Sequence, residues 1–532
     1  MYSPLRTSFV VEPQFSHPIA ALSIPSRSKA AMRPKRNNMQ HNAVPLPLTR
    51  RSLFHSVSGG LYGAALAQLI GRDLALDSRL LAAELPESES SSTVWTDLRQ
   101  RKPHFEPKAK AVIHLFMTGG PSQMDLFDPK PVLDQHHGQS YFDRIAGEVE
   151  NPQSAGALMR SPFRFAQHGQ CGMWVSDALP NIARQVDDIA LIRSMHTTNL
   201  THEPAVYLIQ SGKMGPGRPT VGAWVVYGLG SECQNLPAYV VLDDPNGLPV
   251  NGVENWEAGF LPPIFQGTRF RSTGSPVLNL RPDVERPADL ISVERALLSR
   301  LDEIHRRKHP GQLVLDARIA SYELAAQMQL SASDALDIAS ETQATQDLYG
   351  IGTEPTNSYG RRCLIARRLV ERGVRFVQLY VNGNSWDHHT GLANDLKGCC
   401  DRTDKPIAGL LQDLKQRGLL DSTLIVWGGE FGRLPIAQLP PDKDERKAGR
   451  DHNKNAFSTW MAGAGIKGGT TWGATDEIGL HSVADRVSVP DWHATILHLL
   501  GLSHEQLFVM DNGLKEKLTG VVEARVVDGI LA

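Results

Sequence analysis

Short runs of apolar residues recur along the chain, and polar turns separate them. Six of these runs stand out: 109–117, 189–192, 238–242, 374–380, 423–427 and 457–461. The first of them ends at Gly119, Gly120 and Pro121. A short apolar run that meets a glycine turn is typical of a strand buried on both faces in a parallel sheet. We therefore predict a buried strand at each of the six runs.

Segments with helical periodicity lie between these runs. Tyr359, Cys363, Ala366 and Val370 share one face of a helix, and the apolar residues between 407 and 414 repeat the pattern. Residues 491–501 begin with an aspartate and end with a glycine, as capped helices do. Strands that alternate with helices predict an α/β fold, with a mostly parallel central sheet and helices on both faces.

Composition divides the chain into three parts. Residues 1–70 hold a basic, Pro-rich extension and a signal region, and residues 71–108 are Ser- and Glu-rich, which is typical of a linker. Residues 109–532 are expected to form the α/β domain. Inside it, about 245–345 is first irregular and Pro/Gly-rich, then charged and helical, so we predict an insertion or cap over the sheet.

The N-terminal region has the layout of an export signal. Arg50 and Arg51 precede a mildly apolar stretch, 56–70, which predicts a twin-arginine signal read by the twin-arginine translocase. A basic tail followed by a surface helix is the alternative. The stretch is too short to span a membrane, and no later run of 18 apolar residues follows. We expect an exported protein of the periplasm or cell envelope, without a stable transmembrane anchor.

Charge and cysteine content exclude several classes of function. The formal net charge is -2 and the isoelectric point is about 6.8, so no basic field favours nucleic acid. The five cysteines form no CxxC pair, which argues against a disulfide framework. We find neither a GxGxxG motif after a strand nor a Walker A motif, so a redox or nucleotide-binding enzyme lacks support.

Acids and imidazoles gather where the predicted strands end, and in doubly wound sheets ligands bind beyond the carboxyl ends of the strands. The candidate metal ligands are Asp125, Asp387, His389, Glu430, Asp451, His452 and His493. Aspartate and histidine suit zinc, and carboxylates suit magnesium, calcium or manganese, so we predict one or two divalent ions of these kinds. Each residue alone has a structural alternative; Asp125 can cap a helix, and Glu430 can pair with Arg433.

Four stretches carry a resemblance to a known family: 116–130, 359–370, 427–433 and 491–502. From about 110 to 531, the chain resembles exported "domain of unknown function 1501" proteins, whose fold is that of the alkaline phosphatase and sulfatase superfamily. Residues 385–391 resemble a metal loop of that superfamily, which implies Asp387 and His389 as ligands. Residues 424–432 resemble a sulfatase loop in which Glu430 takes the place of an aspartate and Phe431 that of a histidine.

The chain departs from sulfatases at the nucleophile. Sulfatases carry a Cys-x-Pro-x-Arg segment, whereas 199–205 contains no cysteine and places His202 near that position. A formylglycine mechanism is therefore not expected. Thr198, Thr201 and Ser122 are candidate nucleophiles that need activation by a metal, since a free hydroxyl is a poor nucleophile at neutral pH. The remaining catalytic candidates are His202 and two arginines that suit an oxyanion, Arg433 and Arg450.

Two functions follow from these patterns. The first is an exported metal-dependent hydrolase of phosphate or sulfate esters, acting on a sulfated or phosphorylated glycan or on a small ester. The alternative is a catalytically inactive envelope or polysaccharide-binding protein on the same fold.

Overall fold

The computed structural model describes residues 97–532, except 234, 272–286 and 310–311. Contacts divide the chain into two units, 1–89 and 90–532. The predicted twin-arginine signal and most of the predicted linker lie outside the described residues. Among the helices that are described, none has both the length and the apolar character needed to cross a membrane.

Within the described residues, nine strands form one central sheet. Its order is β14-β5-β13-β9-β1-β8-β6-β7, and β17 also pairs with β5. The strands are β1 (Ala111–Phe116), β5 (Ile189–His196), β6 (Tyr239–Leu242), β7 (Thr268–Phe270), β8 (Phe376–Tyr380), β9 (Thr423–Gly428), β13 (Phe457–Ala462), β14 (Thr470–Trp472) and β17 (Val487–Ser488). All six apolar runs are strands of this sheet, as predicted.

The sheet is mostly parallel. Strand β1 lies at its centre and pairs in parallel with β8 and β9, while β13 runs antiparallel to both β9 and β5. Phe116, the last residue of β1, is level with Tyr380 of β8 and Gly428 of β9. Because three parallel strands end at the same level, the loops that follow them begin side by side.

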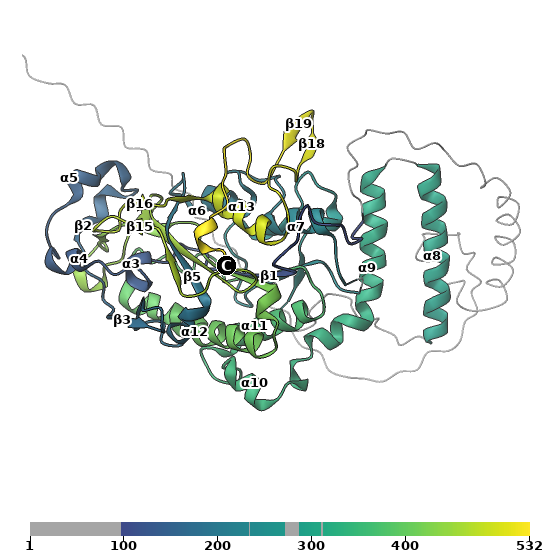
Figure 1. Cartoon of the computed structure of the whole chain (residues 1–532), viewed down its shortest axis with the longest axis horizontal. Coiled ribbons are helices and arrows are strands. Elements are labelled where there is room, and N and C mark those ends of the chain that lie inside the picture. Colours follow the sequence, from purple (N-terminus) through teal and green to yellow (C-terminus); the bar gives the residue numbers. More distant parts are fainter. Residues whose placement is uncertain (1–96, 234, 272–286, 310–311) are drawn as a thin grey trace, which may run out of the picture. The chain divides into compact units, whose positions relative to one another are not determined.

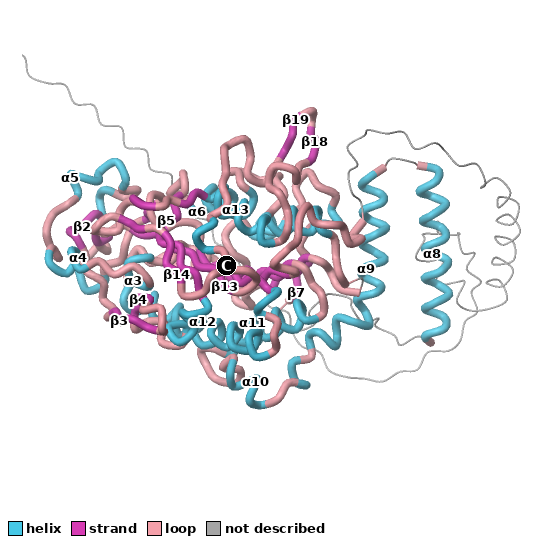
Figure 2. The backbone as a smooth tube through the Cα atoms, viewed as in Figure 1, coloured by secondary structure: helices cyan, strands magenta, loops and turns pink. Residues whose placement is uncertain are grey.

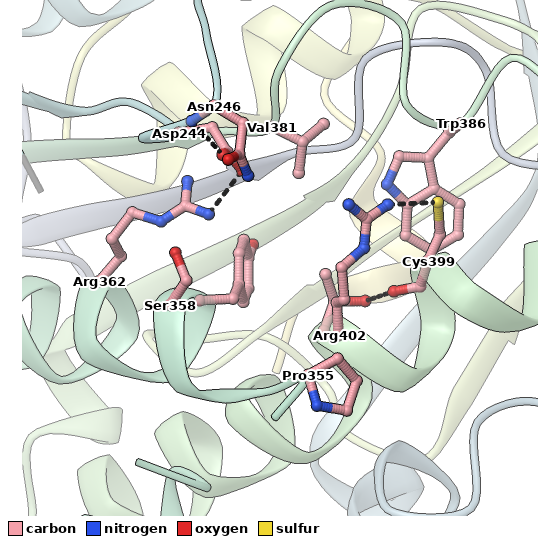
Figure 3. Close-up of a pocket in the computed structure, with 11 residues that line it drawn as sticks. Asp244, Asn246, Pro355, Ser358, Arg362, Val381, Trp386, Cys399 and Arg402 are labelled. Carbon is pink, nitrogen blue, oxygen red and sulfur yellow. Dashed lines mark hydrogen bonds and ion pairs between the residues drawn. The ribbon is translucent and has the colours of Figure 1, made fainter. Parts of the chain in front are cut away.

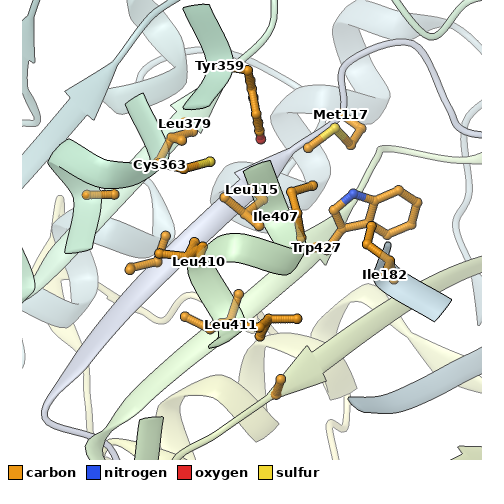
Figure 4. Close-up of a cluster of buried hydrophobic side chains, with 14 of the residues drawn as sticks. Leu115, Met117, Ile182, Tyr359, Cys363, Leu379, Ile407, Leu410, Leu411 and Trp427 are labelled. Carbon is orange, nitrogen blue, oxygen red and sulfur yellow. The ribbon is translucent and has the colours of Figure 1, made fainter. Parts of the chain in front are cut away.

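Helices cover both faces of the sheet, and successive residues of β1 serve opposite faces. Leu115 belongs to a buried cluster with side chains of α11 (Asn357–Glu371) and α12 (Leu392–Gln416). Figure 4 shows part of this cluster, with Leu410 and Leu411 of α12. Phe116 belongs to a second cluster with side chains of α7 (Val221–Leu229) and α13 (Val489–Leu499). The predicted fold class is thus confirmed.

The segment predicted as an insertion or cap begins with irregular chain and β7, then contains α8 (Ala288–Lys308) and α9 (Leu313–Leu336). These two helices run side by side (Figures 1 and 2). Helix α9 contacts α11. The charged helical half of the segment is therefore observed, and its role as a cap stays a prediction.

Short elements frame the carboxyl edge of the sheet. They are α3 (Gln123–Leu126), α6 (His202–Ser211), β2 (Ala155–Leu158), β10 (Gly432–Arg433), β11 (Ile436–Gln438) and β12 (His452–Asn453). Strand β10 pairs with β12, and β11 pairs with β2. Apart from short 3-10 helices, the remaining helices and strands of the described residues are α4 (Pro131–Gln135), α5 (Phe142–Ile145), α10 (Gln343–Leu348), β3 (Phe165–His168), β4 (Met173–Ser176), β15 (Ala474–Thr475), β16 (Ser482–Ala484), β18 (Val509–Asp511) and β19 (Leu514–Glu516).

Candidate metal centre

The loops after β1, β8 and β9 touch at Gly119. Its φ is +120°, and a Cβ there would lie 2.5 Å from the backbone nitrogen of Asp387. Only glycine allows so close an approach at that conformation. The N–H of Gly119 donates to both carboxylate oxygens of Glu430, at 2.9 and 3.1 Å. The backbone after β1 thereby contacts two segments that carry acids: that of Asp387 after β8 and that of Glu430 after β9.

Four residues from three parts of the chain converge beside this contact. His202 begins α6, Asp387 and His389 follow β8, and His452 begins β12. Each offers one ligand atom, and these atoms all lie within 4.8 Å of one another. We call these four residues the His/Asp cluster.

Asp387 is the centre of the His/Asp cluster. Its Oδ2 lies 3.1 Å from Nε2 of His202. Its Oδ1 lies 3.0 Å from Nε2 of His389 and 3.2 Å from Nε2 of His452. All three imidazoles therefore direct the same ring nitrogen toward one carboxylate.

The other ring nitrogen of each imidazole has its own oxygen partner. The partners are Oε1 of Glu430 for His202 at 2.7 Å, Oε2 of Glu150 for His452 at 2.6 Å, and Oε1 of Gln438 for His389. A neutral imidazole that donates its Nδ1–H to an oxygen keeps a lone pair on Nε2. Metal-binding histidines are oriented in this way, so the His/Asp cluster fits a metal ion.

The electrostatics of the His/Asp cluster favour positive charge beside Asp387 and Glu430. Burial would raise the pKa of Asp387, but hydrogen bonds from the three imidazoles and the charge of Arg433 hold it well below its usual range. Burial would lower the pKa of His202, but hydrogen bonds to Asp387 and Glu430 outweigh it and raise that pKa to about 9. A divalent cation would stabilise the same negative groups without requiring protonated imidazoles.

The His/Asp cluster is partly exposed at Asp387 and His389. The side chains of His202 and His452 are 10% and 5% exposed, whereas those of Asp387 and His389 are 19% and 32% exposed. Asp387 lines a cavity of about 550 Å³, together with Ser385, His388 and residues of α12. A small molecule can therefore reach Asp387 from this cavity.

Both arginines that were candidates for binding an oxyanion form hydrogen bonds and ion pairs inside the protein. Arg433 is 1% exposed, donates to the carbonyls of Gly119, Gly120 and Arg450, and pairs with Asp387 at 2.6 Å. Its guanidinium ties the strand-end loops together and holds Asp387 in place. Arg450 is fully buried and belongs to another pair.

That second pair joins Arg450 to Asp125, with Nε 2.7 Å from Oδ2. Neither side chain is exposed, and Ser122 also donates to Asp125. Asp125 and Ser122 are thus occupied by each other and by Arg450. The structure does not bring either residue into the His/Asp cluster.

The other candidates take different positions. His493 is fully buried in α13, with Nε2 2.8 Å from the carbonyl oxygen of Ile209, and burial lowers its pKa to about 4. Within the described residues, it belongs to neither group of potential metal ligands. Thr198 and Thr201 are exposed, and the hydroxyl of Thr198 contacts Sδ of Met214 at 3.7 Å.

Asp451 and Glu430 lie next to the His/Asp cluster rather than in it. Asp451 forms a second possible group with Glu150 and His452, whose ligand atoms also lie within 4.8 Å of one another. Its Oδ2 accepts from the N–H of Asn151 at 3.0 Å. Glu430 is fully buried against Gly119 and His202, where it orients an imidazole.

Three residues of the site are not identified by looking for acids and imidazoles at the ends of predicted strands. The comparison of 199–205 with the sulfatase segment predicts His202 near the nucleophile position, whereas the structure places it among the potential metal ligands. Glu150 and Gln438 were not singled out at all. Glu150 lies in irregular chain and Gln438 in a short outer strand, and no sequence motif marks either residue.

One comparison with known proteins identifies a family, and another yields distant solved structures. The family described as "Protein of unknown function (DUF1501)" matches residues 109–531. No curated protein matches the sequence.

Among similar solved structures is the PsFucS1 sulfatase from Pseudoalteromonas sp., 12% identical with a TM-score of 0.32, covering 76% of this chain and 69% of that chain. The lipoteichoic acid synthase LtaP from Listeria monocytogenes is 9% identical, with a TM-score of 0.30 and coverage of 80% and 79%. An alkaline phosphatase from the Antarctic bacterium TAB5 is 11% identical, with a TM-score of 0.27 and coverage of 68% and 94%.

Proposed function

The chain belongs to the DUF1501 family of proteins of unknown function, and from its site we propose an exported, metal-dependent hydrolase of phosphate or sulfate esters. One observation carries the proposal: three imidazoles, each with an oxygen close to Nδ1, direct Nε2 at one carboxylate on the wall of a cavity. The choice of phosphate and sulfate esters rests on the resemblance of residues 385–391 to a superfamily metal loop.

We propose zinc as the ion. His202, His389, His452 and Asp387 would hold it through three nitrogens and one oxygen. Calcium and magnesium prefer sets of oxygen ligands, whereas zinc favours histidine with few carboxylates. Among the four ions that the sequence allows, the donor set therefore favours zinc.

Such a cation would supply a Lewis acid that polarises an ester oxygen and lowers the pKa of a nearby water toward neutrality. The chain's own residues prepare this site: Glu430 and Gln438 fix the rings of His202 and His389, and Arg433 holds Asp387. In the net reaction, an oxygen of water bonds to phosphorus or sulfur, the ester bond breaks, and the departing alcohol oxygen takes a proton.

Water is proposed as the attacking group, in place of a side-chain hydroxyl. The hydroxyl of Ser122 is bonded to Asp125, and that of Thr198 contacts Met214. Among the described residues, neither contact includes a member of the His/Asp cluster.

Export by the twin-arginine translocase to the periplasm supports metal loading, since that route carries proteins that have already folded. The support for export is the Arg50-Arg51 pair ahead of a short apolar stretch.

Elemental analysis of protein recovered from the periplasm is expected to find about one zinc per chain. A strong chelator should stop hydrolysis of phosphate or sulfate ester substrates, and added zinc should restore it. A variant with Arg50→Lys and Arg51→Lys should remain in the cytoplasm. Metal-free protein with full hydrolytic activity would refute the proposal. Zinc without turnover of any ester would instead favour a binding role.

Glu150→Gln is expected to weaken zinc binding roughly 10- to 100-fold, because outer partners of ligating histidines contribute on that scale. Oε2 of Glu150 lies 2.6 Å from Nδ1 of His452, and this ion-pair contact orients Nε2. The matched control is Glu148→Gln, since Glu148 is bonded to Asn455 and Lys454 instead. Competition with a chromogenic chelator measures both variants, and equal affinities would rule out the positioning role.

A further inference from the structure

A second, smaller cavity of about 40 Å³ lies between α11, α12 and the loop after β8. Its lining includes Tyr359, and Figure 3 shows the further lining residues Asp244, Arg362, Trp386, Cys399 and Arg402. It shares Cys399 and Arg402 with the larger cavity that Asp387 lines. Because Trp386 directly precedes Asp387 in the chain, the small cavity adjoins the proposed metal centre.

Buried donors in the wall of this cavity lack partners. Within the part of the chain that the structure describes, no hydrogen-bond partner is found for Nε1 of Trp386, the hydroxyl of Tyr359 or Nε of Arg362. These side chains are 1%, 3% and 2% exposed. Buried polar groups in native proteins are nearly always satisfied, by protein atoms, water or a ligand. Unpaired N–H and O–H groups around one cavity therefore point to an acceptor inside it.

The charge of the lining is also unbalanced. Arg362 pairs with Asp244 at 2.9 Å, which neutralises both groups. Arg402 donates to Sγ of Cys399 at 3.0 Å, and no carboxylate among the described residues pairs with it. Burial raises the pKa of the Cys399 thiol, so the sulfur stays uncharged and does not act as counter-ion. The lining keeps one net positive charge.

Nearby acids do not remove this charge. Asp401 precedes Arg402 in the chain but pairs with Lys397 on the exposed face of α12. Asp395 is also exposed and lines only the larger cavity. The guanidinium of Arg402 therefore lines the small cavity together with the unpaired donors, and the carboxylate in the same lining, that of Asp244, is paired with Arg362.

We propose that the small cavity binds one oxyanionic group, a carboxylate or a sulfate, between the guanidinium of Arg402 and the donors of Trp386 and Tyr359. Arginine suits such groups because its planar fork donates two parallel hydrogen bonds. The small volume admits a single group rather than a whole molecule.

The cavity also narrows the substrate class, and this step rests on the proposed function. An ester held at the His/Asp cluster would place a second anionic group beyond Trp386. The substrate would then be an ester that carries another carboxylate or sulfate, as an acidic or multiply sulfated glycan does.

Isothermal titration calorimetry of the zinc-loaded protein tests the subsite, with sodium acetate and sodium sulfate as probes at constant ionic strength. Saturable binding is expected. Arg402→Gln should weaken it roughly 10- to 100-fold, the scale of a charge-assisted hydrogen bond. Trp386→Phe keeps the ring, loses the N–H, and should weaken binding by a smaller factor. The control is Arg446→Gln, an exposed arginine paired with Asp444.

The outcomes separate the subsite from the metal centre. Anions that bind only at the metal would be insensitive to both Arg402→Gln and Trp386→Phe, which would overturn the subsite. Absence of saturable binding to the unmodified protein would overturn it as well. Zinc content is measured on the same samples after incubation with zinc. If the protein holds no zinc but still binds the anions, the proposed function is rejected and the subsite is not. If Arg402→Gln does not fold, Trp386→Phe carries the test. A preference for acetate or for sulfate identifies which substrate group binds.

Discussion

Asp387→Asn is expected to abolish both stoichiometric zinc and ester hydrolysis. The carboxylate lies within 3.2 Å of Nε2 of His202, His389 and His452. Asparagine preserves the shape but removes the charge that holds a cation among three neutral imidazoles. Outer partners of metal ligands contribute up to about 100-fold in affinity, so loss of a direct ligand should exceed that factor. Elemental analysis and an ester assay measure the two effects.

The control for this variant is Asp395→Asn. Asp395 lines the same large cavity but is exposed and lies outside the His/Asp cluster. It should keep full zinc content and full activity. Circular dichroism checks that Asp387→Asn is folded, because Arg433 also loses a charged partner. A folded Asp387→Asn protein that still holds one zinc would contradict the assigned ligand set.

Arg450→Met is expected to lower the free energy of unfolding by about 3–5 kcal/mol, as does loss of one partner from other buried ion pairs. Arg450 and Asp125 are both fully buried, with Nε 2.7 Å from Oδ2. Methionine fills much of the same volume but leaves the Asp125 carboxylate without its counter-charge. Urea unfolding of the purified protein measures the change.

Two further variants show whether the buried charge is responsible. Adding Asp125→Asn to Arg450→Met should recover part of the lost stability, since the uncompensated carboxylate is gone. Arg446→Met removes an exposed arginine and should change the free energy of unfolding by less than about 0.5 kcal/mol. If Arg450→Met behaved like Arg446→Met, the pair would not stabilise the protein as its burial implies.

The strands were predictable from the sequence because their signal is local. A strand covered on both faces needs apolar side chains at consecutive positions, as Val112, Ile113 and Leu115 of β1 illustrate. The periodic apolar residues of α11 and α12 are equally local, because one helical face packs on the sheet. The parallel arrangement follows from the alternation of these elements.

The His/Asp cluster was only partly predictable. Asp387 and His389 follow a strand end, where sheet topology concentrates ligands, and His452 stood out through its neighbour Asp451. His202 could not be placed among them, because its position depends on how α6 packs over the strand ends. Arg433 and Arg450 suited an oxyanion by residue type, but burial commits both to internal contacts.

By itself, the sequence determined which segments become buried strands and helices, and which strand ends carry acids and imidazoles. Burial and periodicity depend on neighbouring residues, so short stretches of the sequence are enough to predict them. Tertiary structure alone decided that Glu150, Glu430 and Gln438 each place an oxygen beside the Nδ1 atom of one histidine. The three Nε2 atoms then face Asp387. That choice depends on distances between segments far apart in the chain, which only the packed sheet and its edge strands set.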